Sequence, residues 1–155
     1  MVEYRQGIPR QQLILYQQCI DELIDSNSVV RVIDAYIDTV DMDSLGFRIN
    51  EQDTGARAYA PQLKLKIYVY GYLNGVRSSR RLERECRRNV ELLWLTQGLA
   101  PDFKTIADFR KDNADGLKAT FKAFLLMCAR LQLLGFESVA IDGSKMRAQN
   151  SMNEM

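Results

Sequence analysis

Two groups of side chains in this sequence could do chemistry, one acidic and one basic. Asp142 follows the apolar run Val139–Ile141, which predicts a short buried strand that ends in a carboxylate. A carboxylate in that place is a candidate ligand for Mg²⁺ in phosphodiester chemistry, although such sites gather two or three carboxylates. Asp142-Gly143 is also a common turn dipeptide, so a simple turn remains an alternative.

The basic group is a set of six arginines on one predicted helix. At about 100° per residue they fall within an arc of roughly 120°, and Leu82 and Cys86 lie on the opposite side. Such a one-sided row of guanidiniums repels itself unless something negative lies against it, and DNA phosphates would fit. Pairing with acidic side chains of the N-terminal segment is the alternative. The six are Arg77, Arg80, Arg81, Arg84, Arg87 and Arg88.

The charge is unevenly distributed along the chain, although the net charge is only +1. Residues 1–56 carry four basic and ten acidic side chains, whereas residues 57–88 carry nine basic and two acidic ones. Residues 89–155 carry eight of each. This asymmetry favours a stripe that binds a polyanion. The alternative is that the acidic and the basic segment simply face water or face each other.

Helices must position these groups, because apolar residues recur at helical spacing over most of the chain. A short turn from Asn74 to Arg77 joins two of the predicted helices, as in a helix-turn-helix. Thr105 and Asp108 resemble a capping box at the start of a short helix. Residues 41–59 are polar and predict a long connection. The other predicted helices span residues 13–23, 29–40, 61–73, 79–89, 90–95 and 114–134.

Composition excludes several classes of protein. The sequence has no histidine, which rules out Ser-His and Cys-His catalysis and mixed Cys/His zinc sites. Cys19, Cys86 and Cys128 are odd in number and far apart, which indicates reduced thiols in a cytosolic core. The sequence has no run of eighteen apolar residues, so it predicts no membrane span. The N-terminus lacks the apolar core of a signal peptide. The length fits one domain of ordinary size.

Several segments together resemble a known family. They are Tyr59–Leu65, Tyr70–Glu83, Trp94-Leu95, Gly98–Arg110 and Val139–Lys145. In this order and spacing they resemble the N-terminal half of bacterial insertion-sequence transposases with an InsH-like N-terminal helical domain. The resemblance covers roughly residues 27–150. It departs from the family at Phe103, where the Pro-Asp-His-Thr-Ile type of motif has histidine.

The resemblance implies a mainly α fold. Residues 1–135 would form a helical bundle with a helix-turn-helix-like basic helix pair, and residues 136–155 would begin an incomplete RNase H-like domain with one short strand. We expect DNA contacts from Lys64 and the six arginines. By resemblance, Asp142 matches the first acid of an Asp-Asp-Glu triad and would help hold Mg²⁺ in a completed site.

The implied function is binding of double-stranded insertion-sequence ends in DNA transposition. Because the second Asp and the Glu of the triad are missing, we expect a fragment or one piece of a split enzyme, inactive alone in strand cleavage and transfer. A homo-oligomer or full-length transposase is the expected protein partner, in the bacterial cytoplasm at the nucleoid. The alternatives are a truncated stand-alone DNA-binding regulator and a non-functional folded relic, which the genomic sequence downstream would separate.

Overall fold

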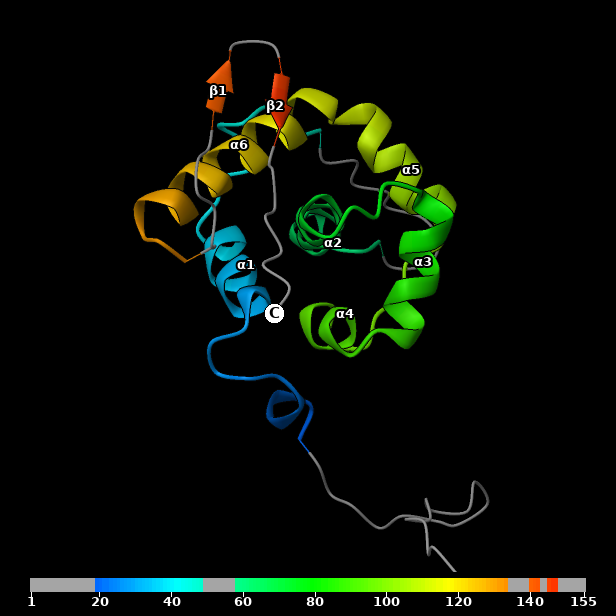
Figure 1. The fold of residues 1–155 in the computed structure, drawn as a ribbon. Helices are drawn as coiled ribbons and strands as arrows, with labels where there is room; N and C mark the ends of the chain where they lie inside the picture. Colours follow the sequence, from blue (N-terminus) through cyan, green and yellow to red (C-terminus); the bar gives the residue numbers. More distant parts are fainter. Residues whose placement is uncertain (1–18, 49–57, 134–139, 143–144, 148–155) are drawn as a thin grey trace, which may run out of the picture.

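The computed structural model describes residues 19–48, 58–133, 140–142 and 145–147, and these residues are mainly helical, as predicted (Figure 1). Within these described ranges, six α-helices follow a short 3₁₀ helix, and two three-residue strands come last. In chain order the elements are η1 (Ile20–Leu23), α1 (Val29–Asp38), α2 (Pro61–Leu73), α3 (Ser79–Arg88), α4 (Val90–Leu95), α5 (Phe103–Asp112), α6 (Ala114–Arg130), β1 (Ala140–Asp142) and β2 (Lys145–Arg147).

Helix α2 is the centre of the bundle. Figure 1 shows it end-on, with the other helices arranged around it, and it packs against α1, α4 and α6. Burial extends around most of this helix. Its buried residues are Leu65, Ile67, Tyr68, Val69, Tyr70 and Gly71. A helix that is apolar on all sides belongs in a core, which is where this one lies.

The predicted helix-turn-helix-like pair stays a prediction. A short turn does join α2 to α3, and Gly71 of α2 lies against Leu82 of α3. A Cβ atom at Gly71 would lie 2.7 Å from the carbonyl oxygen of Val76 and 2.9 Å from Cδ2 of Leu82. The more extensive packing of α3, however, is against α5 and α4.

Helix starts follow the expected capping chemistry with one correction. At the start of α3, the Ser78 hydroxyl accepts a hydrogen bond from the backbone N–H of Arg81 at 3.4 Å. Helix α5 begins earlier than the predicted capping box at Thr105 and Asp108. Its cap is Asp102, whose carboxylate accepts from the Thr105 N–H at 2.7 Å. An acidic cap is favoured because it faces free N–H groups and the positive end of the helix dipole.

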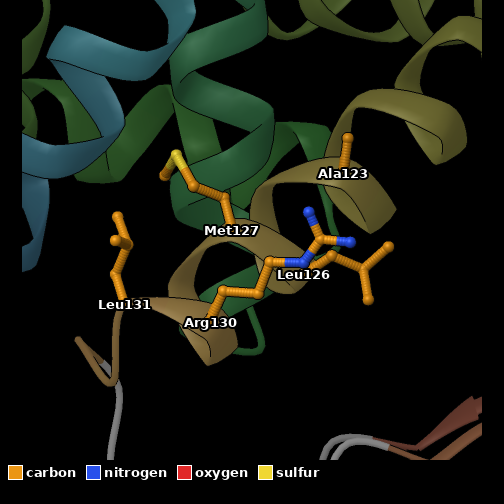
Figure 2. A pocket seen from close by; sticks show the side chains of 5 residues that line it. All are labelled: Ala123, Leu126, Met127, Arg130 and Leu131. Carbon is orange, nitrogen blue, oxygen red and sulfur yellow. The ribbon is translucent and has the colours of Figure 1, made fainter.

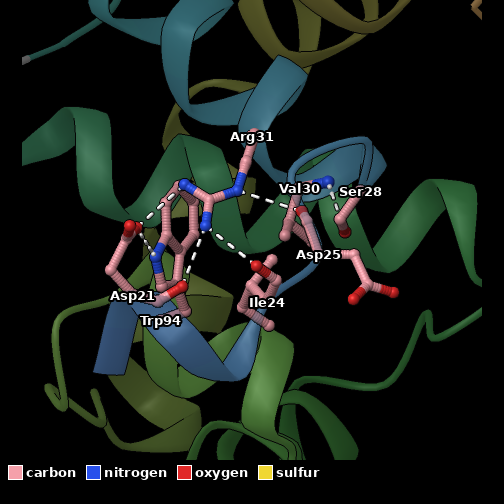
Figure 3. A network of polar contacts seen from close by, with 7 residues as sticks. All are labelled: Asp21, Ile24, Asp25, Ser28, Val30, Arg31 and Trp94. Atoms are coloured by element: carbon pink, nitrogen blue, oxygen red, sulfur yellow. Dashed lines mark hydrogen bonds and ion pairs between the residues drawn. The ribbon is translucent and has the colours of Figure 1, made fainter. Parts of the chain in front are cut away.

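The predicted helix over residues 13–23 falls mostly outside the described residues, and its described end is the 3₁₀ helix η1. Arg31 of α1 holds this end in place (Figure 3). Its guanidinium donates a hydrogen bond to the Asp21 carboxylate at 2.8 Å. Its guanidinium carbon also lies 5.0 Å from the centroid of the Trp94 ring, a cation–π contact. The Trp94 indole N–H donates to the same carboxylate at 2.9 Å. Three elements, η1, α1 and α4, are therefore joined through one arginine.

The cysteine prediction holds for two of the three thiols. Cys86 and Cys128 are free and buried, and burial raises the pKa of each to about 11. Cys19 is free but exposed, so it does not belong to the core. In the described part of the chain, no helix is long and apolar enough to cross a membrane.

The two strands form a small antiparallel sheet. Ala140 pairs with Arg147, Ile141 with Met146, and Asp142 with Lys145. The sequence placed a strand at Val139–Ile141, and Val139 lies outside the described residues. That this strand opens an RNase H-like domain stays a prediction, because a two-stranded sheet of this size is common to many folds.

Candidate nucleic-acid interface

Helix α3 presents its arginines to solvent because its apolar residues anchor the opposite side. Leu82 and Cys86 are 0% and 1% exposed, and the side chains at 77, 80, 81, 84, 87 and 88 are all exposed. This confirms the one-sided helix for five of the six arginines. Arg77 is a correction, because it lies in the turn before α3. The last turn of α3 carries Arg87 and Arg88, where positive charge interacts favourably with the helix dipole.

Two of the six arginines are neutralised by acids of the same helix. The Arg87 guanidinium lies 3.0 Å from the Glu83 carboxylate, one turn earlier. Arg88 pairs with Glu85, and its Nε donates to Oε1 of Glu85 at 2.7 Å. The C-terminal end of α3 therefore carries less free positive charge than the sequence suggested.

The Arg88 pair continues into the core through a polar network. Glu85 is 8% exposed, and Asn89 donates to its second oxygen at 3.2 Å. Asn89 also donates to the hydroxyl of Tyr70, which in turn donates to Glu91 at 2.8 Å. The hydrogen bond from Arg88, followed by that from Asn89, holds the pKa of Glu85 below its ordinary value. Arg88 is thus tied to the bundle.

Arg80 is oriented by helix α5. Its guanidinium carbon lies 4.0 Å from the centroid of the Phe103 ring, a cation–π contact. The backbone N–H of Phe103 donates to Glu83 at 3.3 Å, which fixes the start of α5 against α3. Sequence analysis noted Phe103 only as a departure from a family motif. Its role as a platform for Arg80 depends on the α3–α5 packing, which the sequence does not show.

Arg77, Arg81 and Arg84 have no carboxylate within salt-bridge distance among the residues that the structure describes. We call these three the open arginines. Three described acids of the N-terminal segment pair with cations outside α3. Asp21 binds Arg31, and Lys66 binds the carboxylates of Asp34 at 2.6 Å and of Asp38 at 2.8 Å. The alternative that the acidic segment neutralises α3 therefore finds no support within residues 19–48.

Lys64 lies apart from the arginines. It is half-buried near the start of α2, with its ammonium 4.8 Å from the centroid of the Phe109 ring. Burial lowers its pKa, an effect that the nearby Asp112 carboxylate opposes. Its surroundings are those of a lysine packed against an apolar face with its charge near one acid. A DNA contact from Lys64 stays a prediction.

A magnesium site is not formed by the described side chains. Within the described residues, no three of the Asp, Glu and Cys side chains lie close enough together to hold a metal ion. Asp142 ends β1, and its partner in the sheet register is Lys145. One carboxylate falls short of the two or three that a two-metal site requires, so we assign no step to a metal here.

Surface pockets lie on the other side of the bundle. One of about 340 Å³ on α6 is lined by Ala123, Leu126, Met127, Arg130 and Leu131 (Figure 2). A second, of about 570 Å³, lies between α1 and the end of α6. Both have mainly apolar linings, and neither includes a residue of α3. Neither of these two pockets therefore takes in the basic face of α3.

Comparison with known proteins gives one match. A family model described as Transposase domain (DUF772) matches residues 18–112, more than half of the chain. The matched region runs from η1 to the end of α5 and so contains the whole basic helix. No curated protein and no solved structure matches the chain.

Proposed function

This chain belongs to the transposase domain family DUF772 and has a transposition-related role, and from that premise we propose that it binds double-stranded DNA at insertion-sequence ends through α3. The observation that carries the proposal is the group of open arginines, Arg77, Arg81 and Arg84. All three are exposed, and none has a carboxylate within salt-bridge distance among the described residues. Arg81 and Arg84 lie on α3, and Arg77 lies in the turn just before it.

Phosphate contact is the simplest use of such a surface. A guanidinium presents five N–H donors in a planar fork and keeps its charge at every physiological pH, so it suits phosphate oxygens. Each phosphate neutralised releases counterions from the duplex, and this release drives binding at low salt. Contacts of this kind position a protein on DNA without reading its sequence.

The packing of α3 supports a pre-formed surface. Arg80 already rests on Phe103, and Arg88 is tied to Glu85 and so to the core. Binding would therefore cost less side-chain entropy than it would with six freely rotating arginines. The role of Asp142 as first acid of an Asp-Asp-Glu triad, and the magnesium it would help to hold, stay predictions, because they derive only from the family resemblance.

The direct experiment is a fluorescence-anisotropy titration of a labelled duplex with the full chain between about 50 and 200 mM salt. The duplex should carry the terminal sequence of the element, with a scrambled duplex of equal length as control. We expect binding that weakens steeply with salt, and tighter binding to the end sequence. If the chain binds neither duplex at low salt, DNA binding by α3 is wrong.

A further inference from the structure

Helix α5 brings a cation to the end of the basic face of α3. The exposed Arg110 donates from Nη1 to the backbone carbonyl of Arg77 at 3.2 Å. At the other end of the same contact, Phe103 meets Glu83 and Arg80. The start of α5 therefore lies against the first half of α3, and Arg110, near the end of α5, lies against the turn that leads into α3. The two helices pack against each other, and Figure 1 shows them meeting near the start of α3.

The charges of α5 are divided between its two sides. Phe103 and Arg110 are seven residues apart, so they lie on the same edge of the helix, the one that meets α3. Asp108 and Asp112 lie about 160° around the helix from Arg110, at roughly 100° per residue. The acids that make α5 look nearly neutral in sequence therefore point away from the arginines of α3.

The bond to Arg77 orients Arg110 without neutralising it. A backbone carbonyl accepts a hydrogen bond but carries no net charge, whereas Glu83 and Glu85 cancel the charges of Arg87 and Arg88. One of the five guanidinium donors of Arg110 is used, and the others remain available. In the described residues, no carboxylate lies within salt-bridge distance of Arg110.

Building on the proposed DNA binding, we infer that Arg110 is a further phosphate contact and that the interface crosses from α3 to α5. The effective surface is then Arg77, Arg80, Arg81, Arg84 and Arg110, weighted toward the start of α3, with Arg87 and Arg88 serving mainly to hold the helix. Sequence periodicity could not find this residue, because Arg110 stands 33 positions from Arg77 in a helix of mixed charge.

The test compares two neighbouring residues of α5. Arg110→Gln and Lys111→Gln remove the same charge from the same helix, but the two positions lie about 100° apart around it. We expect Arg110→Gln to lower the slope of log K against log[salt] by about 0.9, and Lys111→Gln to leave it unchanged. Equal slopes for the two variants would overturn the role of Arg110.

Arg110→Lys separates charge from structure. It keeps the positive charge but changes the fork that bonds to Arg77, so a phosphate contact predicts a salt slope near that of the wild type. If Arg110→Lys lost as much slope as Arg110→Gln, the residue would act by holding α3 in place, and the inference would be wrong. Failure of the wild type to bind any duplex would instead remove the proposed function itself.

Discussion

The guanidinium carbon of Arg80 lies 4.0 Å from the ring centroid of Phe103, across the contact between α3 and α5. This contact couples the basic helix to its neighbour at a position where both side chains are partly open to solvent. It explains how one arginine of the face is held in a defined orientation before any ligand arrives.

The stacking predicts a measurable coupling between these two residues. In a double-mutant cycle with Arg80→Ala and Phe103→Leu, urea unfolding should give a coupling energy of about 0.5–1 kcal/mol, the usual size of an exposed cation–π contact. Arg84→Ala combined with Phe103→Leu serves as the matched control and should be additive. Additivity of the Arg80 pair as well would mean that the stacking contributes nothing to stability.

Gly71 is predicted to be intolerant of any side chain. A Cβ there would lie 2.7 Å from the carbonyl oxygen of Val76, which is backbone and cannot swing aside. We expect Gly71→Ala to lower the free energy of unfolding by about 1–3 kcal/mol through overpacking. Gln62→Ala, an exposed position on the same helix, should change it by less than about 0.5 kcal/mol. Similar values for the two variants would contradict the close approach of α2 and α3.

Variants of two acids can distinguish the observed start of α5, capped by Asp102, from the start that the sequence suggested at Thr105 and Asp108. Asp102→Ala removes the acceptor of the Thr105 N–H and should lower the stability measured by thermal or urea unfolding. Asp108→Ala removes the acid of the predicted capping box and should have little effect. The reverse order of the two variants would show that α5 begins nearer Thr105.

Low pH should weaken the ion pair between Glu85 and Arg88, which links α3 to the core. Because its folded-state pKa lies below the ordinary value of 4.5, Glu85 adds stability above pH 4.5, and that stability is lost as the pH falls through the lower folded value. Between about pH 7 and pH 3, the melting temperature of Glu85→Gln should therefore decline less steeply than that of the wild type.

Glu22→Gln, at an exposed position of η1, is the control for the acid experiment and should follow the wild type. Parallel declines for the wild type and Glu85→Gln would show that the Glu85–Arg88 pair does not contribute to stability in the folded chain.

Local sequence signals predicted the helices well where capping and periodicity agree. Pro61 at the start of α2, Ser78 before α3 and the apolar pair Leu82 and Cys86 each act within a few residues, so their effect is visible in the sequence. Helix α6 was expected to reach residue 134 and ends at Arg130, an error in a boundary rather than in an element.

The arrangement of the helices could not be predicted in the same way. The burial around most of α2 depends on the three helices packed around it, which its own sequence does not show. The same distinction holds for the partners of the arginines. Glu83 and Glu85 are near in sequence, whereas the contacts of Arg80 with Phe103 and of Arg77 with Arg110 arise from the packing of α5 against the start of α3.

The most direct test of the central claim removes the three open arginines together. In the anisotropy titration, the Arg77→Ala, Arg81→Ala, Arg84→Ala triple variant is compared with a Lys118→Ala, Lys122→Ala, Arg130→Ala variant of equal charge loss on the exposed side of α6. We predict that the α3 variant loses about 0.9 in salt slope for each phosphate contact removed, while the α6 variant keeps the wild-type slope. Equal losses in the two variants, or an unchanged slope in the first, would contradict DNA binding by α3.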